Sequence, residues 1–359
     1  MRPVALAALA LWGLARAGPP QPPPEPVPAA AQPPAPAPVP PAPAPVPPAP
    51  QPAAAQPPAP QPAAAQPPAP QPAAAQPLAP EPPPSSTGPS LSLEPARVRP
   101  GDAFAVTVRG ATEAPRGELG GRPLRFYPVA GGFRALAGLP VEASPGPLEV
   151  ALTAAGPSGE MALAAGLEVT EPGFAEAELR VAQRFITPPP EARRRMKRDQ
   201  AAFRRAFDQP FEPPLFRDPF AWPREDELTG RFGDRRVFNG KKVSQHYGVD
   251  VAGAAGDPVA AANDGLVVLV RDCYASGKSV ALWHGAGLFS VYFHLSGFAV
   301  KQGARMRRGD LLGRVGKSGR VTGPHLHWGT KLDGIYVDPE SVLRLAAGDG
   351  APADPAAAR

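Results

Sequence analysis

The feature that most limits the fold of this chain is a Pro/Ala-rich stretch over residues 18–88. The 359-residue sequence contains 57 prolines, and they are concentrated before residue 90. Proline fixes φ and lacks a backbone N–H, so such a stretch favours an extended chain over a packed core. A ten-residue unit that begins at Gln51 recurs at Gln61 and Gln71 and offers almost no core-forming side chains. We therefore predict a disordered linker over residues 18–88, which serves either as a spacer or as a neutral tail.

Residues 1–17 have the pattern of an export signal. Arg2 supplies a positive charge, an Ala/Leu-rich run extends from Val4 to Leu14, and Ala15-Arg16-Ala17 fits a cleavage site. The run is too short to span a bilayer, and no other stretch approaches the roughly 20 apolar residues of a membrane helix. We expect export to the periplasm or the extracellular space, without stable membrane insertion after signal removal. An uncleaved N-terminal anchor is the alternative.

Composition limits the partners and the stabilising bonds. Cys273 is the only cysteine, so no intrachain disulfide can form, and stability must come from the core and from any bound metal. The net charge of +5 is a mild basic bias that is compatible with an anionic polymer. No aromatic and basic binding motif accompanies it, so we expect no nucleic-acid partner.

Residues 89–183 predict a small all-β domain. Short alternating segments, such as 103–108 and 148–152, are separated by turns that contain glycine or proline, which is typical of a β-sandwich. The region contains no histidine. We expect it to be a scaffold or spacer, with a binding or inhibitory role as the alternative.

A connector over residues 184–227 follows, with a basic helix at 190–208. Met196, Phe203 and Phe207 fall near one helical face, and arginines surround that face. We interpret the helix as a connector that docks through its phenylalanines. Contact with an anionic polymer is the alternative.

The pattern changes again over residues 228–345, where short strands alternate with glycine-containing turns. The expected strands are 265–270, 279–284, 288–294, 311–315 and 326–332, and Asp333-Gly334 is a strong hairpin signal. We predict a compact antiparallel β domain here and a disordered tail over residues 346–359. The fold class is therefore all-β: a β-sandwich, a connector helix and an antiparallel β domain behind a disordered linker.

All five histidines lie between residues 246 and 327. His246 and Asp250 are four residues apart, but Gly248 and the β-rich surroundings argue for an irregular strand-to-loop segment and not for a helix. With His327 they make three ligands of the types that hold catalytic zinc, which leaves one position open for water. Zinc bound there can lower the pKa of that water and polarise a carbonyl. The sequence predicts one Zn²⁺ per chain, and purely structural histidines are the alternative.

Three further histidines lie in the same part of the sequence. His325 and His327 are two apart, so on a strand they leave the same face, and His325 can act as a proton acceptor or an electrophilic partner. His294 ends an aromatic-rich strand, shares a face with Ser290 and Tyr292 by alternation, and is the predicted second active-site histidine. A structural role is the alternative for His294 and the preferred role for His284.

Residues 228–343 resemble the lysostaphin-like (LytM-type) zinc endopeptidases, which cut peptide bonds in peptidoglycan. The motifs occur in the family's order: Arg231-Phe232-Gly233 with Arg235 and Arg236, His246 to Asp250, Gly256-Asp257-Pro258-Val259, Asn263-Asp264-Gly265, Tyr292 to Ser296, Gly303 to Gly309, and Thr322 to Trp328. The resemblance implies that His246, Asp250 and His327 bind zinc and that His294 and His325 are catalytic. Residues 89–183 also resemble the immunoglobulin-like domain that precedes the peptidase in some members.

The predicted function is a zinc endopeptidase that hydrolyses the peptide crosslinks of peptidoglycan through a metal-activated water. Zinc and one of His294 and His325 would hold the oxyanion, and the other histidine would pass the proton to the leaving amine. Peptidoglycan peptide stems are the expected partner, at the cell wall. Some relatives have lost ligands and activate other wall hydrolases, so the alternative is a non-catalytic peptidoglycan-binding module or a regulator with an envelope protein partner. An enzyme aimed at foreign walls or at non-wall proteins also stays open.

Overall fold

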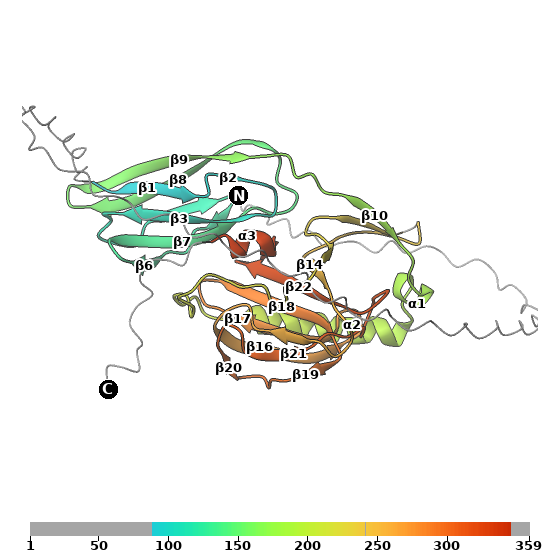
Figure 1. Cartoon of the computed structure of the whole chain (residues 1–359). Helices are drawn as coiled ribbons and strands as arrows, with labels where there is room; N and C mark the ends of the chain where they lie inside the picture. Colours follow the sequence, from blue (N-terminus) through green and yellow to red (C-terminus); the bar gives the residue numbers. More distant parts are fainter. Residues whose placement is uncertain (1–87, 241, 346–359) are drawn as a thin grey trace, which may run out of the picture. The chain divides into compact units, whose positions relative to one another are not determined.

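The computed structural model describes residues 88–240 and 242–345. The chain divides into two units, residues 1–77 and 78–359, and every described residue belongs to the second. Most of the described elements are β-strands, and most of their pairings are antiparallel, which confirms the predicted fold class (Figure 1). The predicted signal peptide, the predicted linker up to residue 87 and the predicted tail lie outside the described residues and stay predictions.

The first β region contains two sheets. One consists of β1 (Ser90–Glu94), β3 (Ala103–Arg109), β7 (Gly132–Gly138) and β6 (Tyr127–Val129), in that order. The other consists of β2 (Arg97–Val98), β9 (Gly159–Val169), β8 (Gly146–Gly156), β4 (Arg116–Leu119) and β5 (Arg122–Pro123).

The two-residue period of β3 explains how these sheets share a core. Phe104, Val106 and Val108 point to one face of the strand and are fully buried. They belong to the same hydrophobic cluster as Val150 of β8 and Leu167 of β9. Two sheets closed over one apolar core form the β-sandwich that the alternating pattern predicts. Its relation to immunoglobulin domains stays a prediction.

The opposite face of β3 is buried for a different reason. Ala103 and Ala105 belong to the large hydrophobic cluster that also contains Val337 and Val342 near the C-terminal end of the described chain. The backbone N–H of Ala103 donates to Ser341 Oγ at 2.8 Å. The first β region is therefore joined to the C-terminal segment by apolar packing and by a buried hydrogen bond.

The histidine-rich region is built around one large sheet. Its order is β11 (Leu228–Gly230), β14 (Val249–Ala252), β22 (His325–Leu332), β18 (Leu288–Leu295), β17 (Gly277–Trp283), β16 (Gly265–Cys273) and β20 (Arg305–Met306), with β23 (Ile335–Val337) also paired to β22. A smaller sheet consists of β15 (Pro258–Ala260), β21 (Leu311–Arg314) and β19 (Gly297–Phe298). A third consists of β10 (Glu176–Leu179), β12 (Arg235–Phe238) and β13 (Lys242–Gln245).

Helix α2 (Pro190–Phe207) covers one face of the large sheet and contacts β16 (Figure 1). The ring of Phe203 lies 5.7 Å from that of Phe293, and the ring of Phe207 lies 5.1 Å from that of Phe289. These contacts agree with the interpretation that the helix docks through its phenylalanines. The short helix α1 (Gln183–Ile186) precedes it.

Two elements depart from the expected pattern. Helix α3 (Pro339–Leu343) was not predicted, although Asp338-Pro339 is a helix-start signal: the Asp338 side chain accepts from the Glu340 N–H, and Pro339 occupies the first turn. Strand β10 lies within the range assigned to the first β domain, yet it pairs in parallel with β12. The end of the range predicted for the first β domain thereby adds a strand beside the histidine-rich region.

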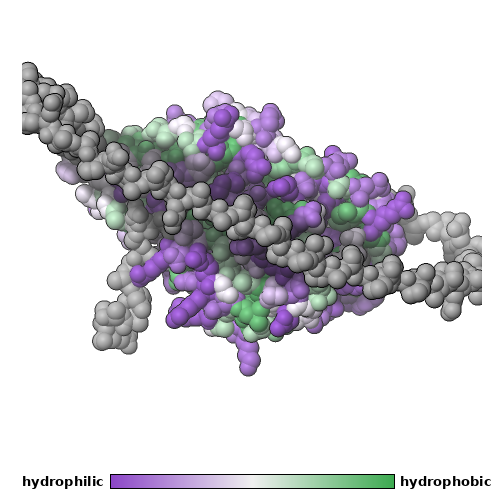
Figure 2. Space-filling model, viewed as in Figure 1, coloured by the Kyte–Doolittle hydropathy of each residue, from purple (hydrophilic) through white to green (hydrophobic). Residues whose placement is uncertain are grey.

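Hydrophilic residues dominate much of the described surface on the face in Figure 2, with apolar residues interspersed. Such a mixed surface is typical of a water-facing protein whose larger apolar side chains pack inside. Among residues 88–240 and 242–345, no helix combines the length and the apolar character needed to cross a membrane.

Candidate metal centre and its pocket

The register of the large sheet brings two of the predicted ligands together. Strands β14 and β22 are antiparallel, and Asp250 lies directly opposite His327. Cross-strand partners on one face have neighbouring side chains. His246 follows the last residue of β13, in a short irregular segment before β14. This agrees with the irregular strand-to-loop conformation expected for the segment from His246 to Asp250.

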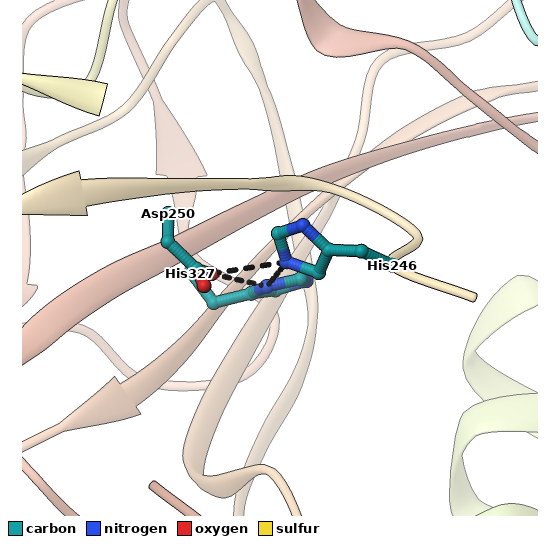
Figure 3. A group of neighbouring side chains, drawn as sticks. All are labelled: His246, Asp250 and His327. Carbon is teal, nitrogen blue, oxygen red and sulfur yellow. Dashed lines mark hydrogen bonds and ion pairs between the residues drawn. The ribbon is translucent and has the colours of Figure 1, made fainter. Parts of the chain in front are cut away.

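The three side chains converge on one point (Figure 3). His246 Nε2 lies 3.0 Å from His327 Nδ1 and 3.1 Å from Asp250 Oδ1, and His327 Nδ1 lies 2.9 Å from Asp250 Oδ1. The side chains are buried, with exposed fractions of 4% for His246, 6% for Asp250 and 9% for His327. Two ligands on a tetrahedral zinc ion with bonds of about 2.0–2.1 Å are about 3.3 Å apart, so the triangle is close to the size that zinc requires.

The shorter of two contacts at His246 Nδ1 favours one tautomer. The carbonyl oxygen of Arg231 lies 2.7 Å away and can only accept, whereas Arg236 Nη2 lies 3.0 Å away and can only donate. The carbonyl contact favours a proton on Nδ1. Nε2 is then an unprotonated lone pair directed at His327 and Asp250. A donated N–H on the far ring nitrogen is the usual support of a metal-binding histidine. The donor set therefore fits zinc.

Arg236 supports the carboxylate from the other side. Its Nη2 donates to Asp250 Oδ2 at 2.6 Å, while Oδ1 faces the two histidines. Burial tends to raise the pKa of Asp250, but the adjacent rings of His246 and His327 outweigh it and hold that pKa far below its usual range. Asp250 is therefore ionised, as a metal ligand must be.

The third ligand is held by packing. The ring of His327 stacks on that of Phe293, with 5.2 Å between centroids and 7° between planes. Burial lowers the pKa of His327 to about 4, although Asp250 opposes the shift. The imidazole is therefore neutral near pH 7 and offers a lone pair.

His294 and His325 lie beside the three ligands. Their ring centroids are 5.0 Å apart, and His325 Nε2 is 3.7 Å from Asp250 Oδ1. His294 Nδ1 donates to the carbonyl of Ser318 at 2.8 Å, and His325 Nδ1 lies 3.0 Å from the carbonyl of Gly323. Burial lowers the pKa of His294 to about 3, so its ring is neutral. With Nδ1 engaged in each ring, Nε2 is the nitrogen left for proton chemistry.

The predicted face of His294 is wrong in one respect. Regular alternation would place it with Ser290 and Tyr292, but those hydroxyls bond to each other and to His284 in the interior. The pairing of β17 and β18 shifts register after Tyr292, and His294 has a φ of +64°. This bulge turns both His294 and its neighbour Phe293 into the pocket.

His284 forms its hydrogen bonds inside the core and not with the candidate metal ligands, as expected for a structural histidine. It is fully buried, its Nδ1 lies 2.6 Å from the carbonyl of Asp264, and its Nε2 lies 2.7 Å from Ser290 Oγ. Both nitrogens are therefore used inside the core.

The pocket brings all five predicted site residues together: His246, Asp250, His294, His325 and His327. It also contains Arg236 and Arg320, to which the sequence assigned no role. Arg236 follows Arg235 on β12, but nothing in the sequence spacing identifies Asp250 as its partner. Arg320 lies in the turn before His325 and His327. Its place in the pocket depends on the three-dimensional fold and leaves no signal in the sequence. Residues Ala177 and Leu179 of β10 complete one wall.

Comparison with known proteins adds sequence relatives. Residues 244–339 match Peptidase family M23. The peptidoglycan DD-endopeptidase ShyA of Vibrio cholerae is 40% identical over 102 residues, which cover 28% of this chain and 24% of that protein. The DD-carboxypeptidase/endopeptidase Mpg of Neisseria meningitidis is 40% identical over 97 residues, which cover 27% of this chain and 22% of that protein. The chain thus matches about a quarter of the length of these curated relatives.

A solved structure extends the likeness beyond that region. It is a Pseudomonas aeruginosa protein assigned to peptidase M23, with a TM-score of 0.52 and 30% identity. The match covers 68% of this chain and 94% of the solved chain. With nearly all of that relative covered, and with residues 244–339 matching the family directly, the chain belongs to peptidase family M23.

Proposed function

We propose that this protein is a zinc-dependent endopeptidase that hydrolyses the peptide crosslinks of bacterial peptidoglycan. The observation that carries the proposal is the convergence of His246, Asp250 and His327 within about 3 Å of one another, beside two further histidines. Membership of peptidase family M23 and relatives named as peptidoglycan DD-endopeptidases support the substrate class.

The ligand set suits zinc because it combines two neutral imidazoles with one carboxylate and leaves room for a fourth ligand. When bound, zinc supplies a Lewis acid that polarises the scissile carbonyl and makes water a better nucleophile at neutral pH. His246 Nε2, Asp250 Oδ1 and His327 Nδ1 are the atoms that would hold it.

The chain's own residues divide the remaining work. His294 and His325 each have Nδ1 within hydrogen-bond distance of a backbone carbonyl, so each presents Nε2 to the pocket. One Nε2 accepts a proton and delivers it to the leaving amine. The other ring, once it carries a proton on both nitrogens, donates a hydrogen bond from Nε2 to the developing oxyanion. Backbone carbonyls hold both rings in place, so the reaction pays little for reorienting them.

We propose export to the cell envelope on the sequence pattern of residues 1–17, since peptidoglycan lies outside the cytoplasmic membrane. Residues 89–183 fit a scaffold that presents the peptidase, and their relation to immunoglobulin domains belongs to this proposal as well.

The test is digestion of isolated peptidoglycan by purified, zinc-loaded protein, with mass spectrometry of the released fragments. The expected result is a steady appearance of new amino groups and of uncrosslinked stem peptides. His325→Ala should bind the wall and release fragments at least about 100-fold more slowly. Wall binding by the wild type without any release would instead favour the alternative, a non-catalytic regulator of another hydrolase.

A further inference from the structure

Arg320 is a cation in the pocket. Among the described residues, its half-buried guanidinium makes no ion pair and no side-chain hydrogen bond. Burial, aided by the nearby charge of Arg236, lowers the pKa of Arg320. A partly buried guanidinium without an anion is costly, so the site favours a ligand that supplies one.

The acids that share the pocket are already engaged. Asp250 Oδ2 accepts from Arg236, and its Oδ1 faces the two metal-site histidines. Asp234 accepts from the backbone N–H groups of Ala175 and Arg231. Two arginines and two aspartates line the pocket. Arg236 pairs with Asp250, whereas Arg320 makes no ion pair with any described residue. Bound zinc would make the pocket still more attractive to anions.

A ring contact helps to hold the side chain of Arg320 in place. Its guanidinium carbon lies 4.9 Å from the centroid of the Phe238 ring, which is close enough for a cation–π contact. Phe238 is itself buried and lies opposite Leu179 in the pairing of β12 with β10. The side chain of Asn239 holds the chain just after β10 through two 2.9 Å hydrogen bonds to the backbone of Val181.

The backbone of Arg320 is fixed by the same turn that orients a predicted catalytic residue. Its N–H donates to the carbonyl of Ala275 at 2.7 Å. Two residues earlier, the carbonyl of Ser318 accepts from His294 Nδ1, and Ser318 Oγ accepts from the N–H of Lys278. The turn therefore holds the backbone of Arg320 two residues from the carbonyl that orients the ring of His294.

We propose that Arg320, stacked on Phe238, is a specificity-determining residue that binds a free carboxylate of the substrate peptide near the bond to be cut. The inference rests on the proposed function and names the substrate class for that site: peptides with a free carboxylate are preferred over the same peptides with a carboxamide. A guanidinium suits this role because its planar fork matches a carboxylate with two parallel hydrogen bonds.

The experiment uses one crosslinked stem-peptide fragment in two forms, with its carboxylates free or converted to carboxamides. We expect zinc-loaded wild-type protein to have a kcat/KM about ten- to a hundredfold higher for the free acid, the range expected for one charge-assisted contact. Arg320→Gln should remove that preference by slowing only the free-acid substrate. Arg320→Lys, which keeps the charge without the fork, should lie between the two.

Arg305→Gln is the matched control, because Arg305 is exposed on β20 and does not line the pocket. It should leave the preference unchanged. Equal loss on both substrates in Arg320→Gln, or a wild-type enzyme indifferent to amidation, would overturn the proposal while leaving the peptidase function standing. Competition by orthophosphate in the wild type but not in Arg320→Gln, without any effect of amidation, would assign the site to phosphate and would also overturn it.

A binding measurement separates this inference from the function on which it rests. Calorimetry of the two fragments with His325→Ala should show tighter binding of the free acid, and Arg320→Gln added to that variant should abolish the difference. Carboxylate-selective binding without cleavage by the wild type would retain the subsite and reject the peptidase function. Absence of both binding and cleavage would reject both.

Discussion

Asp250 and His327 lie directly opposite each other in the antiparallel pairing of β14 and β22, with Asp250 Oδ1 2.9 Å from His327 Nδ1. These residues are far apart in sequence, so the pairing of two strands, and not local spacing, makes the candidate metal centre. A strand register that slipped by one residue would turn one of the two side chains to the other face.

Gly248 packs so closely against His327 that a larger side chain does not fit at this position. A Cβ added at Gly248 would lie 2.6 Å from both His327 Nε2 and the carbonyl oxygen of Trp328. Gly248→Ala should therefore displace the His327 ring and weaken zinc binding by about 10- to 100-fold, the range typical of changes just outside a ligand set. Competition with a fluorescent zinc chelator measures this affinity.

Gly297→Ala is the control for this substitution, because an added Cβ there meets no atom within 4 Å. It should keep the wild-type zinc affinity. If Gly248→Ala also kept it, the close packing around His327 would not matter for the metal centre.

Arg236 should set the zinc affinity through Asp250. Arg236→Gln removes the charged donor 2.6 Å from Asp250 Oδ2, so the carboxylate loses its support, and we expect about a tenfold or greater rise in the zinc dissociation constant. Arg235→Gln is the matched control: Arg235 pairs with Glu176 at 3.3 Å, but both side chains are more than half exposed. A surface pair of this kind contributes little, so equal effects of the two substitutions would contradict the role of Arg236.

His325 should separate chemistry from metal binding. It lines the pocket, but its nitrogens are not among the three atoms that converge. His325→Ala should therefore retain zinc while its kcat on a crosslinked peptide falls by about 10²- to 10⁴-fold, the usual contribution of a proton-transfer group. Metal analysis and steady-state kinetics on the same preparation test both halves. A variant with the wild-type rate would exclude His325 from the reaction.

The buried ring of His284 should make the folded protein less stable towards unfolding in acid. Burial lowers its pKa to about 4, below the value of about 6.5 expected in the unfolded chain. Above pH 6.5 the ring is neutral in both states. As the pH falls from 6.5 to about 4, the unfolded chain binds a proton that the folded chain does not, so stability decreases by about 3 kcal/mol through this window.

Urea unfolding between pH 7.5 and 4.5, with a chelator present, measures that slope. His284→Asn should be less stable at pH 7.5, because a packed and hydrogen-bonded ring is lost, but its stability should fall less steeply below pH 6.5. Ser290→Ala is the control, since it removes one partner of His284 and keeps the titrating ring. Parallel slopes for His284→Asn and wild type would show that another group titrates.

Much of the architecture could be predicted from the sequence, because alternation and turn residues are local signals. The strands around His294 and His327, the helix docked through Phe203 and Phe207, and the irregular segment at His246 follow from such patterns. The bulge at His294 could not be predicted, because it depends on a register shift against β17. Local alternation carries no information about such a shift.

The candidate site divides in the same way. Residue types and the family resemblance brought His246, Asp250, His294, His325 and His327 into one hypothesis, and the structure places them in one pocket. Arg236 and Arg320 were missed because an arginine in a sequence does not reveal whether an acid lies opposite it. That distinction depends on which strands and turns meet in space.

The central claim is that one zinc ion is held by His246, Asp250 and His327 and is needed for hydrolysis. The direct measurement is the zinc content of the purified protein alongside its activity on peptidoglycan, before and after chelation and after zinc is restored. We predict one zinc per chain, loss of activity with its removal, recovery with its return, and neither zinc nor activity in His327→Ala. A metal-free wild-type protein that cleaves peptidoglycan and is indifferent to chelators would contradict the account.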